Sequence, residues 1–141
     1  MKMRNDQLKF RCWDKVNKKF VPPSHIAING NGILLITDSG MYEKLQNKNY
    51  CNVDQEYVVQ QWTVLKDNFG NEIWEGDIIE FKRKDREGFH KAEIKFVEGA
   101  YLAKFIKHEG TLSFFRLLQL NDYCNIKVIG NIFENSELLK Q

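Results

Sequence analysis

The chain has 141 residues and a formal net charge of +2 at pH 7, and 43% of its residues are hydrophobic while 28% are charged. This length allows one ordinary domain or two small ones, and the composition excludes an intrinsically disordered chain. A pI near 8.4 gives only a mild attraction for phosphate-bearing partners, so any nucleic-acid binding must rest on a local patch.

The first half of the chain shows strand patterns separated by turn residues. Apolar and basic side chains alternate along residues 8–13, which predicts a strand with one buried face, and a second strand at 19–21 completes a hairpin. Asn and Gly residues at 29–32 form a turn signal before the short apolar run 33–37, which suits a buried strand. Residues 41–55 are polar and without clear periodicity, and we expect a loop there with one weak strand around 41–45.

The second half is richer in strand signals. Alternation returns at 57–64, where one predicted face carries Trp62 and Val64. A Gly76-Asp77 corner then leads into a strand, because Gly allows a sharp bend and Asp can bond the N–H groups that the bend leaves unpaired. A charged hairpin tip at 82–91 and strands at 92–97, 101–106, 112–118 and 125–132 follow, and the tail at 135–139 suits one capped helical turn. Short strands at this spacing favour a small barrel or sandwich.

These signals predict a mainly β protein with a division near residue 60. The 13% aromatic content and the presence of only two prolines also favour strands. We expect an N-terminal β-rich region at 1–60 and a barrel region at 61–141. No Pro/Gly/Ser-rich linker marks the boundary, so we expect the two halves to pack together.

The residue pattern predicts no catalytic site, no metal site and no cofactor. The three cysteines, Cys12, Cys51 and Cys124, include no CxxC pair, and we interpret them as reduced thiols. No two of the three histidines lie at a metal-ligand spacing or beside a nucleophile in a known motif, which favours surface or packing roles. They are His25, His90 and His108.

Two small groups of residues have both a chemical and a structural interpretation. Glu75 and Asp77 could act as a carboxylate pair, but Gly76 between them lies in a bend, and we favour a structural turn role for Gly76 and Asp77. Trp13 with Asp14, and Trp74, could line a ligand-binding surface. We favour core packing for the tryptophans and turn capping for Asp14.

The run at 82–91 is the one feature that could bind nucleic acid. Phe89 and His90 are interleaved with its basic side chains, so it could contact phosphates and stack a base. Asp85 and Glu87 dilute its charge, and such runs are commonly solvated faces that discourage edge-to-edge aggregation. The candidate nucleic-acid-binding residues are Lys82, Arg83, Lys84, Arg86 and Lys91.

Targeting signals are not evident in the sequence. Residues 1–7 are polar and are not followed by an apolar run long enough for a signal peptide. No stretch approaches the ~20 apolar residues of a membrane span. We therefore expect a soluble, cytoplasmic protein without a membrane partner.

Three blocks of the sequence resemble the YopX family of bacteriophage and prophage proteins. Residues 9–14 (KFRCWD) look like the family's opening KFRAWD, and residues 61–79 (QWTVLKDNFGNEIWEGDII) resemble its core QYTGLKDKNGKEIYEGDIV. Residues 128–139 (VIGNIFENSELL) are similar to its ending VIGNIYENPELL. The chain departs from the family at Val64, where Gly is usual, and at Ser136, where Pro is usual. The first departure suggests an altered turn.

The resemblance implies a phage or prophage gene product in a bacterial host, with a C-terminal SH3-like β-barrel and self-association into a ring-like or other homo-oligomer. It implies no established catalysis. We therefore expect a non-catalytic, oligomeric interaction protein with an accessory role in phage biology. The alternative is a nucleic-acid-binding module that uses the hairpin at 82–91.

Overall fold

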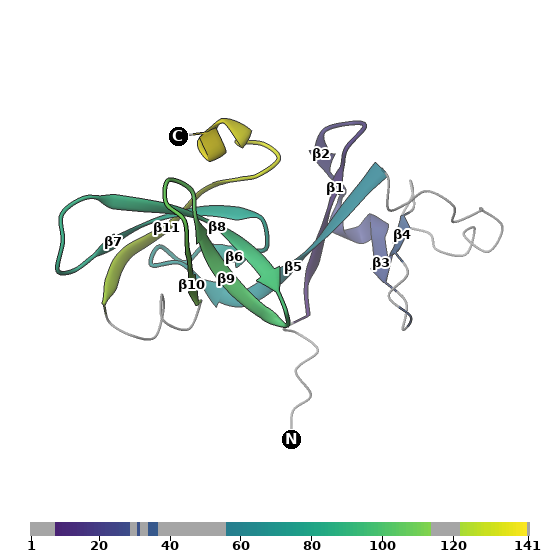
Figure 1. The fold of residues 1–141 in the computed structure, drawn as a ribbon. Coiled ribbons are helices and arrows are strands. Elements are labelled where there is room, and N and C mark those ends of the chain that lie inside the picture. The colour runs from purple at the N-terminus through teal and green to yellow at the C-terminus, as the bar shows by residue number, and fades with distance from the viewer. Residues whose placement is uncertain (1–7, 29–30, 32–33, 37–55, 114–121, 141) are drawn as a thin grey trace, which may run out of the picture. The chain divides into compact units, whose positions relative to one another are not determined.

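A computed structural model describes residues 8–28, 31, 34–36, 56–113 and 122–140. This part of the chain is mainly β, which confirms the predicted class (Figure 1). The chain divides into two compact units, one comprising Lys9–Gln61 and the other consisting chiefly of Trp62–Gln141. The long strand β5 (Tyr57–Lys66) runs from the first unit into the second.

The first unit contains the predicted opening hairpin. β1 (Phe10–Asp14) pairs antiparallel with the short β2 (Lys19–Phe20) and, on its other side, with the first half of β5. A 3-10 helix, η2 (Pro23–His25), is followed by β3 (Ile26–Ile28), which pairs with β4 (Leu34–Ile36). β4 lies within the predicted run 33–37. The sequence pattern does not predict β3, because three apolar residues are too few to show alternation, and the weak strand expected at 41–45 lies outside the described residues.

The second unit is built on a five-stranded antiparallel sheet, in the order β10-β9-β8-β7-β11. Its strands are β7 (Asp77–Arg83), β8 (Phe89–Val97), β9 (Ala100–Phe105), β10 (Thr111–Ser113) and β11 (Tyr123–Asn131). The sheet curls in Figure 1. β10 and β11 stand at the two ends of the strand order, so the closure expected of an SH3-like barrel stays a prediction.

The core of the second unit lies on one face of this curled sheet. β6 (Glu72–Trp74), which pairs with the second half of β5, also contributes to it. Alternate positions along each strand point to this face, as the period of two requires. Among the described residues, this core contains eight buried side chains, namely Ile73, Ile79, Phe81, Ala92, Ile94, Ala103, Leu112 and Ile126.

The alternation predicted for β5 fails at its second half. Trp62 is buried, but Val64, predicted on the same face, is 39% exposed, whereas Thr63, predicted on the other face, is only 6% exposed. The cause is an irregularity between Trp62 and Lys66, in which Val64 adopts a φ of 72°. A bulge of this kind shifts the following side chains to the opposite face of the strand.

The chain ends in a second 3-10 helix, η4 (Ser136–Lys140), where one helical turn was predicted. None of the helices in the described residues has the length and apolar character needed to cross a bilayer.

Candidate nucleic-acid interface

The basic run at 82–91 forms the hairpin between β7 and β8. Strand pairing continues further into this run than the sequence suggests, because Phe81 pairs with His90 and Lys82 pairs with Phe89. The turn itself covers only residues 84–88. Lys82, Arg83 and Lys91 therefore lie in strands, where their faces are fixed by the pleat.

The basic residues of this hairpin do not share one face. Lys82, Phe89 and Lys91 point to the side opposite the core, because their neighbours Phe81 and His90 point toward it. Arg83 lies on the core side of the strand by the same alternation, and its Nε is 2.7 Å from a carboxylate oxygen of Asp85. The expected dilution of the charge by acidic residues thus acts on Arg83 directly. Lys84 and Arg86 are exposed in the turn.

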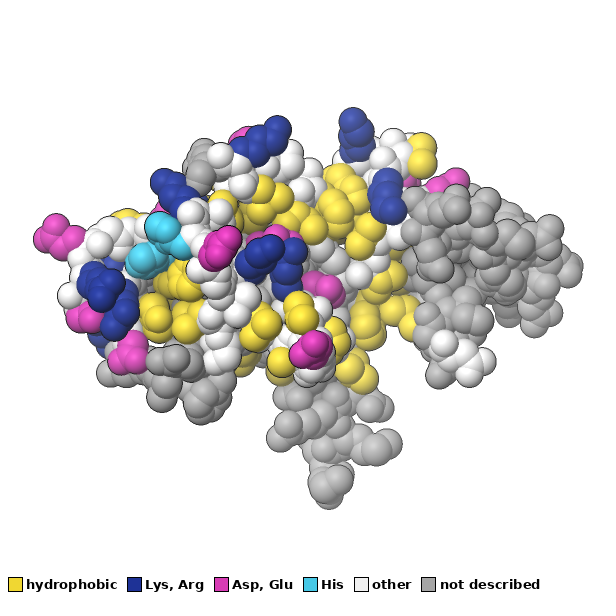
Figure 2. Space-filling view, viewed as in Figure 1, with side chains coloured by type: hydrophobic (Ala, Val, Ile, Leu, Met, Phe, Trp, Pro, Cys, Tyr) yellow, Lys and Arg dark blue, Asp and Glu magenta, His cyan; other side chains and the backbone are white. Residues whose placement is uncertain are grey.

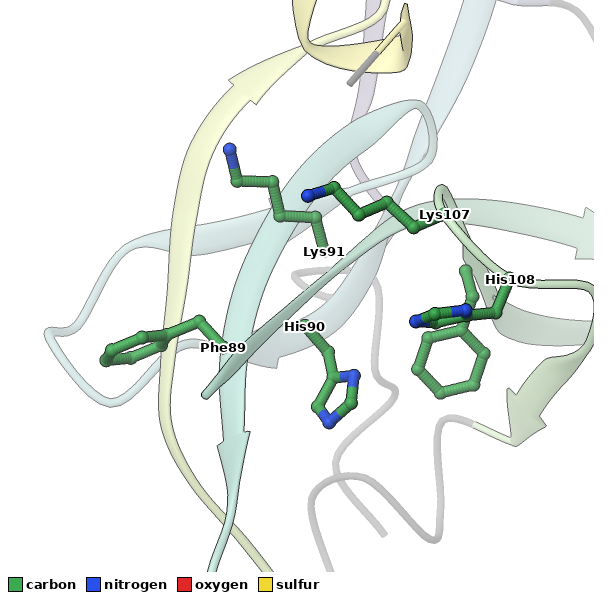
Figure 3. Close-up of a pocket in the computed structure, with 6 residues that line it drawn as sticks. Phe89, His90, Lys91, Lys107 and His108 are labelled. Carbon is green, nitrogen blue, oxygen red and sulfur yellow. The ribbon is translucent and has the colours of Figure 1, made fainter. Parts of the chain in front are cut away.

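The turn at 106–110 brings two further residues, Lys107 and His108, to the basic hairpin. The sequence pattern did not connect them with it. The N–H of Ile106 donates to the carbonyl of Lys91 at 3.0 Å, and the N–H of Phe105 donates to the carbonyl of Gly110 at 3.2 Å. These bonds hold Lys107 and His108 beside the start of β8. A shallow pocket of about 50 Å³ results, lined by Phe89, His90, Lys91, Phe105, Lys107 and His108 (Figure 3).

Aromatic packing fixes the histidine at the centre of this pocket. The buried Phe81 ring lies 5.8 Å from the imidazole of His90, and the Phe105 ring lies 5.8 Å from it on another side. His108 follows at 6.5 Å from His90, measured between ring centroids. In Figure 3, both lysine side chains extend to one side of the β8 backbone, whereas His90 extends to the other. The histidine pair was missed because the two residues meet only through strand register.

The lining of the pocket suits a small anion. Its charged and polar side chains are lysines and histidines, and no carboxylate lines it. At about 50 Å³ the pocket is small and has room for a group of a few atoms. No three His, Cys, Asp or Glu residues gather as metal ligands within the described ranges. Figure 2 shows histidine side chains lying among lysine or arginine side chains, with acidic side chains nearby.

Gly76 lies in the turn between β6 and β7, and Asp77 is the first residue of β7. Gly76 has a φ of 79°, its N–H donates to the carbonyl of Ile94 at 2.8 Å, and its carbonyl accepts the N–H of Ile132 at 2.9 Å. The carboxylate of Asp77, which is 2% exposed, accepts the N–H of Trp74 at 2.8 Å. Both residues therefore contribute hydrogen bonds that shape this turn.

The other candidates from the sequence lie in structural positions. Trp13 is 6% exposed and meets the Phe20 ring edge-on at 5.0 Å, so it packs in the first unit instead of offering a face to a ligand. Asp14 caps the β1–β2 turn by accepting the N–H groups of Val16 and Asn17. Trp74 is half-buried, as is His25.

The cysteines of the described chain form no disulfide. Cys12 and Cys124 are both free thiols, and Cys51 lies outside the described residues. Burial, aided by the charge of Asp14, raises the pKa of Cys12 to about 11. That thiol is therefore protonated at neutral pH and is a poor nucleophile.

The sequence block 61–79 is held by hydrogen bonds within the second unit. The hydroxyl of Thr63 donates to the carbonyl of Ile73 at 2.6 Å. The carboxylate of Asp67 accepts the N–H of Asn71 at 2.8 Å and that of Val128 at 3.0 Å. Burial opposes its ionisation, but these hydrogen bonds outweigh burial and lower the pKa of Asp67. The polar side chains of this block serve the architecture of the sheet.

Comparison with known proteins places the chain in one family. The chain is similar to the crystal structure of protein EF1440 from Enterococcus faecalis, with 28% identity and a TM-score of 0.56 over 94% of this chain and 97% of that one. It shares its fold with protein yopX from Bacillus subtilis, at 19% identity and a TM-score of 0.56 over 92% and 95% of the two chains. No curated protein matches. A family model described as YopX protein matches residues 9–140, and the chain therefore belongs to the YopX family.

Proposed function

We propose that this protein is a non-catalytic binding protein that contacts the phosphate backbone of nucleic acid through the basic hairpin surface, defined as residues 82–91 and 106–110. The observation that carries the proposal is the pocket lined by Lys91, Lys107, His90 and His108, whose lining includes no carboxylate. Cationic and N–H donor groups of this kind bind phosphate oxygens, and phosphate contacts supply most sequence-independent affinity for nucleic acid.

Binding accounts for the molecule better than catalysis does. The carboxylates with the most distinctive surroundings, Asp14, Asp67 and Asp77, each accept main-chain N–H groups. A general acid or base would instead need to face a substrate. We place the protein in the cytoplasm of a bacterial host, in the accessory phage or prophage role that its family resemblance implies.

Direct measurement of nucleic-acid binding tests the proposal. Fluorescence anisotropy with labelled DNA should give an affinity that falls between about 50 and 200 mM salt. Replacing Lys91 and Lys107 together by Gln should weaken binding and reduce the slope of log affinity against log salt by about 2. Lys104→Gln is the matched control, because this exposed lysine lies on β9 and does not line the pocket. Binding that is absent, or indifferent to both salt and the double substitution, would exclude this function.

Self-association is a second candidate, favoured by apolar side chains at the far end of β8. Phe96 is 50% exposed and Val97 is 43% exposed, next to the two-residue turn into β9. The two side chains point to opposite faces of the strand, and each could be buried against a partner. Light scattering coupled to size-exclusion chromatography should then report an oligomer that Phe96→Ser with Val97→Ser dissociates. A monomeric mass at every concentration would rule this candidate out.

A further inference from the structure

We infer that the nucleic acid is bound as a single strand, with one base stacked on the ring of Phe89 and a neighbouring phosphate in the pocket beside it. This inference rests on the proposed function and specifies the form of its ligand.

The exposed ring of Phe89 is the first observation. Phe89 begins β8 and is 59% exposed, although burial of a Phe side chain stabilises a folded protein. No aromatic ring of the described chain contacts it, whereas the nearby rings of Phe81, His90 and Phe105 pack on one another. Phe89 thus offers a flat apolar surface to solvent.

The cations around this ring are the second observation. Lys82 is the cross-strand partner of Phe89 and shares its face, and Lys91 lies two residues further along the same face, opposite Glu80. An aromatic platform flanked by lysines is the arrangement with which proteins bind single strands, since bases stack on the ring while cations follow the backbone.

The pocket and the ring suit different parts of a nucleotide. Phe89 lines the pocket together with Lys91 and Lys107, so the ring and the anion site adjoin. The pocket is small, at about 50 Å³, and its lysines suit a phosphate group, whereas the exposed ring of Phe89 suits the face of a base. In Figure 3 the Phe89 ring extends away from His90 and His108, so both positions can be occupied at once.

A duplex cannot use this arrangement along its length. Its bases are stacked on one another and paired at their edges, so their faces are closed to a protein ring. An unpaired strand can turn a base out onto the ring, and base–aromatic stacking works for any base.

The test compares three ligands and three proteins. The ligands are a labelled oligo-dT of about 12 nucleotides, the corresponding duplex, and an oligomer of the same length made of abasic sites. The proteins are the natural chain, Phe89→Leu and Phe69→Leu. Phe69 is a matched control, because its ring is 63% exposed and lies 5.6 Å from the Nζ of Lys127, yet it does not line the pocket.

We expect oligo-dT to bind more tightly than the duplex or the abasic oligomer. Phe89→Leu should weaken oligo-dT binding by roughly tenfold and leave abasic binding unchanged, whereas Phe69→Leu should change neither. Equal affinity for oligo-dT and the abasic oligomer, or an unaltered affinity of Phe89→Leu, would overturn the single-strand inference. If that happened and the Lys91 and Lys107 double variant still lost binding to all ligands, the proposed nucleic-acid binding would stand and only the single-strand inference would fail.

Discussion

Two turns of the molecule use the same residue types in different ways. The turn after β1 begins at Asp14, whose carboxylate accepts the N–H groups of Val16 and Asn17 and the side-chain amide of Asn17 at 2.7–2.9 Å. All three bonds lie within four consecutive residues. Asp14 is therefore a local cap that shapes one hairpin of the first unit.

The turn after β5 begins at Asp67 and extends the same chemistry across the second unit. Its carboxylate accepts the N–H groups of Phe69 and Asn71 and the side-chain amide of Asn71, but it also accepts the N–H of Val128, 61 residues away. The neighbouring Asn68 accepts the N–H of Ile126 at 2.6 Å and donates its own N–H to the carbonyl of Ile126. The turn thus takes the place of a neighbouring strand for part of β11, which is an edge strand of the five-stranded sheet, and satisfies its main-chain groups.

The largest expected effect follows from removing the Asp67 carboxylate. Asp67→Asn presents one oxygen and an NH₂ group to four N–H donors, so buried donors lose their acceptor. We expect a loss of about 2–4 kcal/mol in the free energy of unfolding, measured by urea denaturation.

Asp14→Asn is the control for this comparison. It removes the same kind of acceptor from a turn whose bonds are all local, and we expect a loss of about 1 kcal/mol. Equal losses in the two variants would show that the bond to Val128 adds nothing to stability.

Protonation of Asp67 at low pH should also weaken this turn. The effect should be smaller than that of Asp67→Asn, because the carbonyl oxygen of a protonated carboxyl group can still accept a hydrogen bond. The folded pKa of Asp67 is lowered relative to the ordinary value of about 3.9. Its contribution to stability is therefore fully present above that value and is lost as pH falls through the folded pKa. The stability difference between the natural chain and Asp67→Asn should narrow between about pH 5 and pH 2. A difference that stays constant over this range would mean that Asp67 remains ionised or that its charge is irrelevant.

The local half of this comparison was predictable from the sequence. Asp and Asn at short spacing predict turns, and the strand periods predict the mainly β class and most of the strands. The bond from Val128 to Asp67 was not predictable, because it joins residues 61 positions apart and depends on where the turn after β5 meets β11, which no local pattern specifies.

The candidate nucleic-acid interface also has one part that was predictable from the sequence and one part that was not. Lys82 to Lys91 were visible as a basic run, and Asp85 was correctly seen to dilute it. The contributions of Lys107 and His108 depend on the turn at 106–110 meeting the start of β8. Only the folded sheet brings these two residues to His90.

The smallest expected effect concerns the strand that leads into the Asp67 turn, and it is a gain in stability. Val64 has a φ of 72°, and a β-branched residue in this region costs about 1–3 kcal/mol. Glycine adopts this conformation without strain but loses about 0.5–1 kcal/mol more conformational entropy on folding. Val64 is 39% exposed, so its side chain gains only part of the burial of a core valine. Val64→Gly should therefore raise the free energy of unfolding by about 1 kcal/mol, seen as a higher urea midpoint with an unchanged m-value.

Val64→Ala is the control, because it keeps a Cβ in the same strained region and should gain much less stability. If Val64→Gly were instead destabilised, packing of the valine at the bulge would outweigh its backbone strain, and the bulge would be held by its side chain as well as by the Thr63 hydrogen bond to Ile73.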